Sequence, residues 1–242
     1  MCTVSWSFRN QSCRVFFNRD ERRSRLRAER PRQIEWRGAE LIAPIDPQGG
    51  GSWIALNRAG IVAFLLNNYA AILDDSALGR CRSRGEIPLS IASRTDFAAC
   101  VEALETLDTE RYRPFIAGVV SPSGESHAIA WDGMTLKLRD LTRSFLTTSS
   151  FRFDAVESYR RARYEELIRS GGADWAWSHG LNYHQDLNNA DPAFNPLMSR
   201  EDAETHCISV ITATPEGTRF EYLERIENSD EFLNAGSWSF GE

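Results

Sequence analysis

A cysteine stands at position 2, directly after the initiator methionine, and the polar string Asn18–Glu21, with the sequence NRDE, follows soon after it. An initiator methionine before a small residue is usually removed, which would leave Cys2 with a free α-amine beside its thiol. The ordinary pKa values of these two groups, about 7.7–8 and about 8.5, make them a self-contained base and nucleophile. The amine can take the thiol proton directly or through a water. The alternative is that Cys2 is a small residue at a frayed chain end.

The NRDE string supplies the groups that would hold such a nucleophile in place. Arg19 can bind a carboxylate or lower the pKa of a nearby thiol, and Asp20 can orient an ammonium such as the amine of Cys2. Strand-like stretches over 2–8 and 13–17 flank a short polar turn and predict a hairpin. A hairpin returns the end of its second strand to the start of the first, so we expect the string to lie beside Cys2. The alternative is a solvated turn at a strand end.

Aromatic and histidine side chains gather in one later segment and form a second candidate site. They would make the wall of a pocket for a flat ligand, although aromatic residues also serve simple packing. The residues are Trp175, Trp177, His179, Tyr183 and His184. The four histidines lack the spacing of a metal site, and no Gly-rich loop is followed by the Lys-Ser or Lys-Thr of a phosphate-binding motif. We therefore expect no metal.

Composition narrows the class of protein. The 242 residues carry a net charge of −6, which argues against a nucleic-acid partner. The arginine-rich segment 19–37 contains interspersed acids, so we interpret it as solvated and partly self-paired, with binding of anionic groups around 22–32 as the alternative. Five cysteines without a CxxC motif are typical of a reduced, cytoplasmic protein. The longest apolar stretch, 59–66, is far shorter than the roughly 20 residues that a membrane span needs.

Further strands and helices would position these groups. Hairpins are predicted at 52–66, 115–131 and 205–226, helices at 95–108 and 154–171, and a weaker helix at 79–94 near Pro88, while 173–202 has a mixed pattern. Strands come in pairs along the whole chain and helices fall between them, without a linker or repeat. We therefore predict one α+β domain over residues 1–242, with antiparallel sheets and helices packed outside.

Taken together, these motifs resemble the NRDE family, also called the transport and Golgi organisation family. The matching features occur in order along nearly the whole chain, most clearly over 1–90. They are Met1-Cys2, NRDE at 18–21, Arg30-Pro31, GGSWIALN at 50–57, Gly60, Asn68-Tyr69, SRGE at 83–86 and a closing hairpin at 205–226. The string NRDE alone would be weak evidence, whereas its combination with Cys2 and GGSW is specific.

The family is similar to cysteine-type N-terminal-nucleophile hydrolases, which implies a four-layer αββα sandwich. By resemblance, Cys2 matches the nucleophile, Arg19 and Asp20 match the residues that orient the N-terminus, and Asn68 lies where such enzymes place an oxyanion donor. Two features depart from the pattern. Thr148, in the stretch FLTTSS, is the nearest match to an expected asparagine, and the gap between Glu21 and Arg30-Pro31 is longer than usual. Loss of one oxyanion donor costs roughly 10²–10³ in rate in other enzymes.

Two functions follow from these expectations. In the first, processed Cys2 hydrolyses an amide or transfers the acyl group of a small molecule, with Arg19 and Asp20 holding the geometry and Asn68 with Thr148 binding the oxyanion; Asn18 and Glu21 complete the site. In the second, which the resemblance implies, the protein binds haem or an acyl-CoA or lipid-related ligand without catalysis. No cofactor is required for the first, and haem is a candidate ligand in the second. The oligomeric state stays open.

Overall fold

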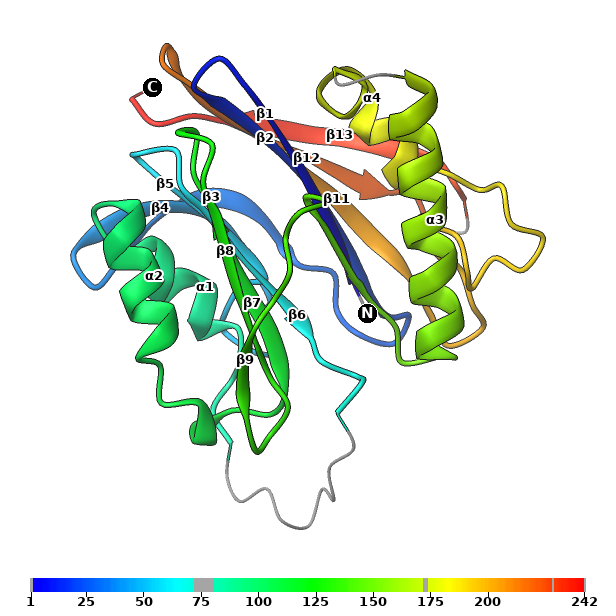
Figure 1. Cartoon of the computed structure of the whole chain (residues 1–242), viewed down its shortest axis with the longest axis horizontal. Helices are drawn as coiled ribbons and strands as arrows, with labels where there is room; N and C mark the ends of the chain where they lie inside the picture. Colours follow the sequence, from blue (N-terminus) through cyan, green and yellow to red (C-terminus); the bar gives the residue numbers. More distant parts are fainter. Residues whose placement is uncertain (1, 72–80, 172–173, 228, 242) are drawn as a thin grey trace.

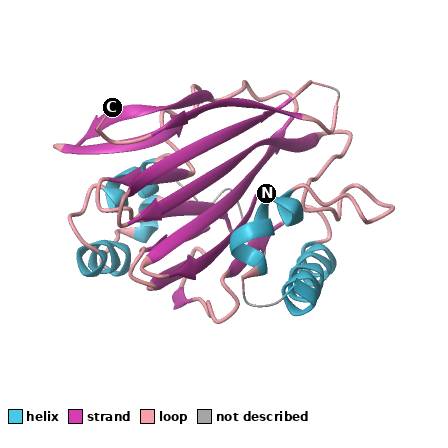
Figure 2. Ribbon diagram, turned by 90° about the horizontal axis from the view of Figure 1, so that it is seen from above, coloured by secondary structure: helices cyan, strands magenta, loops and turns pink. Residues whose placement is uncertain are grey.

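Two antiparallel sheets are stacked face to face, with helices on both outer sides (Figures 1 and 2). The computed structural model describes residues 2–71, 81–171, 174–227 and 229–241. Sheet A has the strand order β10-β1-β2-β11-β12-β13, and sheet B has the order β3-β4-β5-β6-β7-β8-β9. The layers therefore run helix, sheet, sheet, helix, and the predicted αββα sandwich is confirmed.

The strands of sheet A come from both ends of the chain and from its middle. Their bounds are β1 Cys2–Arg9, β2 Ser12–Arg22, β10 Phe145–Thr148, β11 Ala203–Thr214, β12 Gly217–Arg225 and β13 Phe232–Trp238. The strands of sheet B follow one another along the sequence. Their bounds are β3 Glu29–Trp36, β4 Ala39–Ile45, β5 Ile54–Asn57, β6 Val62–Asn67, β7 Phe115–Val120, β8 Ser126–Trp131 and β9 Leu136–Leu138.

Four α-helices cover the outer faces in the part of the chain that the structure describes. The helices α1 (Glu86–Ala92) and α2 (Phe97–Glu105) pack on sheet B, whereas α3 (Phe153–Gly171) and α4 (Trp175–His184) pack on sheet A. A short 3-10 turn, η2, spans Thr109–Arg111. The α2 helix begins as predicted, because the Asp96 carboxylate caps it by accepting a hydrogen bond from the Ala99 backbone at 2.9 Å.

The hairpin of β1 and β2 is the element that positions the N-terminal residues. Arg9 pairs with Ser12 across a two-residue turn, and Asn10 and Gln11 take positive φ angles of 46° and 56°. A turn with two positive φ angles matches the twist of the strands and fixes their register. Cys2 is thereby paired with Arg19, so the prediction that this hairpin brings the NRDE string beside Cys2 is confirmed.

Alternation along β1 separates the two buried layers. Cys2, Val4 and Trp6 contribute to the core between the sheets. The intervening Thr3 and Ser5 point to the other face, where they meet side chains of α3 and α4. This period of two is what lets one short strand serve the site and the helix layer at the same time.

Several strands were not predicted from the sequence. β3 forms from the arginine-rich segment and β4 follows it, while β10 and β13 are the two edge strands of sheet A. From Arg22 onward the segment is largely exposed and paired with acids, as expected: Arg30 meets Glu224 at 2.9 Å and Arg32 meets Glu29 at 3.2 Å. Arg19 and Asp20, at its start, are buried instead. Among the described helices, none has the length and apolar character needed to cross a bilayer.

Candidate active site

Cys2 lies at the end of sheet A, in a row of side chains contributed by four neighbouring strands. Thr148 of β10 pairs with it on one side and Arg19 of β2 on the other. Arg19 in turn pairs with Cys207 of β11. Cys2 and Cys207 both belong to the core between the sheets, and Arg19 stacks on a residue of that core. The row therefore faces sheet B.

A pocket of about 710 Å³ opens beside this row. Cys2 is 9% exposed and forms part of its wall together with Arg19, Asp20 and Glu21. Strand β6 and several loops of sheet B complete the wall. Their residues are Asp46, Gln48, Gly49, Gly51, Ser52, Trp53, Leu65, Asn67, Tyr69, Cys81, Arg82, Ser83, Arg84, Gly85 and Arg113, and β2 adds Arg22 and the residue Arg25 beyond it.

Two motifs that are far apart in sequence meet at this wall. The backbone N–H of Ser52, in GGSW, donates to the carbonyl of Gly85, in SRGE, at 2.8 Å. A Cβ atom on Gly51 would lie 2.4 Å from the carbonyl carbon of Gly85. Only glycine permits this approach, so the two loops are locked together and give the pocket a fixed edge.

Arg19 joins the two sheets at the floor of the pocket. Its guanidinium forms an ion pair of 2.8 Å with Asp46 and stacks over the Trp53 ring at 4.4 Å. A weaker contact of 3.7 Å reaches Glu21. The Nη1 atom of Arg19 is buried and has no hydrogen-bond partner. Arg19 thus lies next to Cys2 as expected and keeps a donor for a further group.

Asp20 faces the opposite side of sheet A, toward α3. Its carboxylate accepts a hydrogen bond from Thr205 at 2.7 Å and lies 3.4 Å from the guanidinium of Arg160, whose side chain is fully buried. Arg160 also donates to Thr3 at 2.9 Å and to Thr147 at 3.3 Å. These contacts tie the ends of β1, β2 and β10 together, so Arg160 anchors the strand ends that carry Cys2 and Thr148.

The environment of the Cys2 thiol disfavours its ionised form in the chain that carries Met1. Burial raises the pKa of the thiol to about 11, and the negative charge of Asp20 acts in the same direction. The positive charge of the chain's N-terminus acts against this rise, as do a hydrogen bond from the Asp20 backbone and the positive charge of Arg19. Burial therefore outweighs the positive charges near Sγ, and ionisation of Cys2 needs a base beside it.

The two predicted oxyanion residues differ in their placement. Thr148 is fully buried beside Cys2 and is not among the described residues that line the pocket, but its hydroxyl has no hydrogen-bond partner. Asn68 is not among the described residues that line the pocket, because its amide nitrogen is directed to the Trp131 carbonyl at 3.0 Å. The neighbouring Asn67 lines the pocket instead, where its amide donates to the Tyr69 hydroxyl at 2.9 Å.

Three of the other predicted binding residues form a buried network on the outer face of sheet A, away from the pocket. The Asn18 amide donates to the carbonyls of His184 and Pro196, both at 2.8 Å, and its oxygen lies 2.7 Å from Nδ1 of His184. Ser5 contacts Nε2 of that imidazole at 2.8 Å, and Tyr183 donates to the backbone of α3 at 3.0 Å. Burial lowers the pKa of His184 to about 3. The network holds α4 against the sheet.

The remaining aromatic candidates also lie in α4. The Trp175 and His179 rings stack with 6.1 Å between centroids, and the Trp177 carbonyl accepts a hydrogen bond from Arg14 at 3.0 Å. None of the three is among the described residues that line the pocket at Cys2. These three residues therefore do not form a wall of the pocket at Cys2, because α4 covers the opposite face of sheet A.

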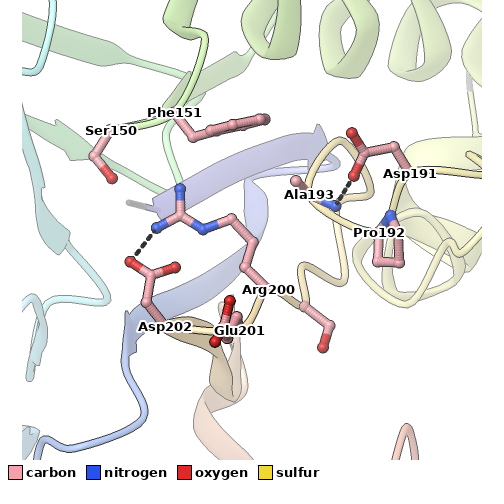
Figure 3. A pocket seen from close by; sticks show the side chains of 9 residues that line it. Ser150, Phe151, Asp191, Pro192, Ala193, Arg200, Glu201 and Asp202 are labelled. Atoms are coloured by element: carbon pink, nitrogen blue, oxygen red, sulfur yellow. Dashed lines mark hydrogen bonds and ion pairs between the residues drawn. The ribbon is translucent and has the colours of Figure 1, made fainter.

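A second hollow, of about 740 Å³, lies between the loops that follow β10 and precede β11 (Figure 3). Arg200 extends across it, forms an ion pair of 2.9 Å with Asp202 and lies 5.5 Å from the centroid of the Phe151 ring. The described lining contains neither a cysteine nor a histidine. We therefore place the candidate active site at Cys2.

Sequence reasoning did not single out three residues that shape the site. Asp46 follows β4 and accepts hydrogen bonds from the backbones of Gln48 and Gly49, a turn that its position before Pro47 could have indicated. Arg84 lies within the SRGE motif, which gives no sign that this arginine in particular lines the pocket. Arg160 lies on α3 directly before Arg161 and close to Arg163, and no local pattern distinguishes the buried arginine from these partly exposed neighbours.

Two stacked antiparallel sheets between outer helices form the αββα fold of the N-terminal-nucleophile hydrolases, with Cys2 at the end of a strand. Solved structures of this class are similar. They include the N-acylethanolamine-hydrolyzing acid amidase ortholog of Caenorhabditis elegans (TM-score 0.62, 10% identity, 99% of each chain), the C2A mutant of conjugated bile acid hydrolase from Clostridium perfringens (0.60, 12%, 100% of this chain and 97% of that one) and penicillin V acylase from Agrobacterium tumefaciens (0.56, 12%, 93% and 83%). At sequence identities of 10–12%, this likeness shows that the chain shares their fold.

The sequence also matches the family described as Transport and Golgi organisation 2 over residues 1–164. This chain belongs to that family, as the NRDE resemblance indicated. A comparison with curated proteins gives no match.

Proposed function

We propose that this protein is an N-terminal-nucleophile amidohydrolase in which Cys2, freed by removal of Met1, attacks the carbonyl carbon of an amide in a small molecule. The observation that carries the proposal is the position of Cys2. Its side chain lies in the wall of a pocket of about 710 Å³ and pairs in register with Arg19 and Thr148. The similar solved structures named as amidase, acylase and bile acid hydrolase support the same chemistry.

The free α-amine is the base that the buried thiol needs. It takes the Sγ proton, and its positive charge then favours the thiolate in a site where burial raises the pKa of the thiol. The thiolate forms a bond to the carbonyl carbon, and the carbonyl electron pair moves to oxygen. The leaving nitrogen receives the proton from the amine as the C–N bond breaks. Water then attacks the thioester and releases the acid, which regenerates the thiol.

The other residues of the row have roles that depend on their contacts. Arg19, fixed by Asp46, keeps Nη1 for the substrate or the developing oxyanion. The hydroxyl of Thr148 is a second donor without a partner. Asp20, held through Arg160, fixes the strand end from which the amine would project. When an amine replaces water as acceptor, the same steps give acyl transfer, and exclusion of water from the pocket decides between the two.

Intact mass and turnover together test this proposal. We expect the purified protein to lack Met1 and to release an amine from at least one of three amides, namely penicillin V, a conjugated bile acid or an N-acylethanolamine. The Cys2→Ala variant should lose roughly 10⁴-fold or more of that activity. The matched control Cys81→Ala removes the other thiol in the same wall and should keep it. Retention of Met1, or activity that survives Cys2→Ala, would refute the mechanism.

We infer a second candidate, binding of an anionic ligand without turnover, from the arginines in the pocket wall. Their positive charges suit the phosphates of an acyl-CoA or the acidic groups of haem. A porphyrin ring also needs a large apolar surround, and among the described lining residues Trp53 and Leu65 are the main apolar side chains. The residues present thus fit the acidic groups of haem better than its ring. A titration with haem that leaves the Soret band unshifted would exclude it as the ligand.

A further inference from the structure

Trp53 places an unpartnered hydrogen-bond donor in the wall of the pocket at Cys2. Its side chain is 6% exposed, and its indole N–H has no hydrogen-bond partner among the residues that the structure describes. A buried N–H without an acceptor costs free energy, and native proteins leave few such groups. An acceptor atom of a bound molecule would remove this cost.

A second unpartnered donor lies directly against this indole. The Arg19 guanidinium stacks over the Trp53 ring at 4.4 Å, and its Nη1 has no hydrogen-bond partner in the described part of the chain. Both N–H groups are donors, so neither offers the other a lone pair. Arg19 pairs in register with Cys2, and all three residues line one pocket. The fold therefore brings both donors to the same wall as the nucleophile.

The surroundings of Trp53 hold its indole in place. The Trp53 carbonyl accepts a hydrogen bond from the Leu65 backbone at 2.8 Å, which ties it to β6. The preceding residue, Ser52, donates through its backbone to the Gly85 carbonyl at 2.8 Å. Burial and the stack with Arg19 leave the ring itself little freedom. A donor fixed in this way can meet developing charge without rearrangement, which is what makes such groups effective in catalysis.

The donors that the family resemblance suggested do not occupy this position. Thr148 is not among the described lining residues, and the Asn68 amide is directed to a carbonyl of β8. Of the lining residues that the structure describes, only Trp53 and Arg19 have a buried side-chain N–H without a partner. A carbonyl oxygen beside Cys2 therefore has these two groups as its donors on the pocket side.

We propose that Trp53 is a catalytic residue, whose indole N–H donates with Nη1 of Arg19 to the carbonyl oxygen of the acyl group that Cys2 attacks. This role rests on the proposed function and adds a neutral donor to it. As the bond from Sγ to carbon forms, the carbonyl electron pair moves to oxygen, and both hydrogen bonds strengthen with the growing charge. The electron pair returns when the C–N bond breaks. Trp53 transfers no proton, so the exchange between amine and thiol is unchanged.

Replacement of Trp53 by phenylalanine removes the N–H but keeps an aromatic ring over which Arg19 can stack. With whichever of the three amides is turned over, kcat should fall by roughly 10²–10³ and KM should change little, because the lost hydrogen bond is stronger in the transition state. Trp6→Phe is the matched control and should keep kcat. Trp6 is a buried tryptophan of the same core whose indole N–H also lacks a described partner, but it is not among the described residues of this wall.

Alkylation of Cys2 separates an oxyanion donor from a residue that supports the thiolate. Iodoacetamide reacts with a thiolate at a saturated carbon, so no negative charge develops on a carbonyl oxygen in that step. The alkylation rate of Cys2, followed by peptide mass spectrometry, should therefore be equal in the wild-type protein and in Trp53→Phe. Thermal unfolding of Trp53→Phe and Trp6→Phe confirms that both variants are folded.

An NMR titration tests the contact without turnover. In Cys2→Ala protein labelled with heavy nitrogen, the indole signal that disappears on Trp53→Phe substitution belongs to Trp53. Penicillin V, glycocholic acid and N-hexanoylethanolamine would each be added at millimolar concentration. We expect at least one of these amides to move the Trp53 indole proton downfield, as a hydrogen bond to a carbonyl oxygen does, and to leave the Trp6 signal in place.

Three results would overturn this role: a loss of kcat in Trp53→Phe no larger than in Trp6→Phe, a parallel loss of the alkylation rate, or a Trp53 indole proton that none of the amides moves. These outcomes are separate from failure of the proposed catalysis. For a protein that retains Met1 and hydrolyses nothing, the titration alone decides the role of Trp53. An active enzyme whose kcat survives Trp53→Phe keeps the proposed function without this donor.

Discussion

Replacement of Arg160 by methionine is expected to destabilise the fold and to loosen the strand ends that carry the site. The side chains of Arg160 and Asp20 are both fully buried, with 3.4 Å between Nη1 and Oδ2. Arg160 also donates to Thr3 and Thr147, the neighbours of Cys2 and Thr148, and to the Phe194 carbonyl at 3.2 Å. Methionine fills much of the same volume but supplies none of these hydrogen bonds.

The magnitude follows from the burial of the pair. Removing one partner of a buried ion pair costs about 3–5 kcal/mol, because the other charge loses its partner in a site that excludes water. For a chain of this size each kcal/mol lowers the unfolding temperature by about 2–4 °C, so a decrease of roughly 6–20 °C is expected. Arg161→Met is the matched control. Arg161 is partly exposed and pairs with Glu157 one helical turn away, an interaction worth about 0.3–0.5 kcal/mol.

Urea unfolding of a double-mutant cycle measures the interaction itself. Asp20→Asn and Arg160→Met should each destabilise the protein, and the double variant should lose less than the sum by about 0.5–3 kcal/mol, since it leaves no uncompensated charge. Hydrogen exchange at the β1 and β10 ends should rise in Arg160→Met. The reasoning is refuted if Arg160→Met costs no more than Arg161→Met, or if the two single changes are additive.

Two further predictions concern other buried groups. Stability should fall as pH decreases from 6.5 toward 3, because burial holds the folded-state pKa of His184 and of His206 at about 3 while the unfolded chain is protonated near 6.5. Each imidazole contributes about 5 kcal/mol at most. The slope of unfolding free energy against pH should flatten in His184→Gln, and an unchanged slope would contradict this. Gly118→Ala should cost roughly 1–3 kcal/mol in urea unfolding, because its Cβ would lie 2.6 Å from Cζ of Phe64. A loss below about 0.5 kcal/mol would show that the ring moves aside easily.

Local sequence patterns predicted most of the fold. The apolar alternation of 2–8 and 13–17 and the polar turn between them gave a hairpin, and Asp96 was one of two proposed caps of α2. The strands that escaped prediction have weak local signals. β10 is four residues long, and β3 is an exposed strand of charged residues whose pairing with β4 gives it its structure.

In the candidate site too, residues placed by local geometry were predicted and the others were not. Cys2 and Arg19 were predicted as neighbours because a hairpin with a two-residue turn fixes their register through short-range geometry alone. By contrast, Asn67 lines the pocket, whereas its neighbour Asn68 donates to a carbonyl of β8. Neighbouring side chains along a strand point to opposite faces, so an error of one residue in the sequence reading selects the wrong asparagine.

The sequence by itself determined that Cys2 begins a strand, that the NRDE string returns beside it, and that the chain forms paired strands with helices between them. These features depend on contacts a few residues apart, whose geometry the chain's own turns impose. The tertiary structure decided which charged groups share the pocket. Asp46, Arg84 and Arg113 come from separate loops of sheet B, and they face Cys2 only because the two sheets pack with the Arg19 and Trp53 contact between them. Such long-range placement follows from the packing of the whole core, and no local pattern encodes it.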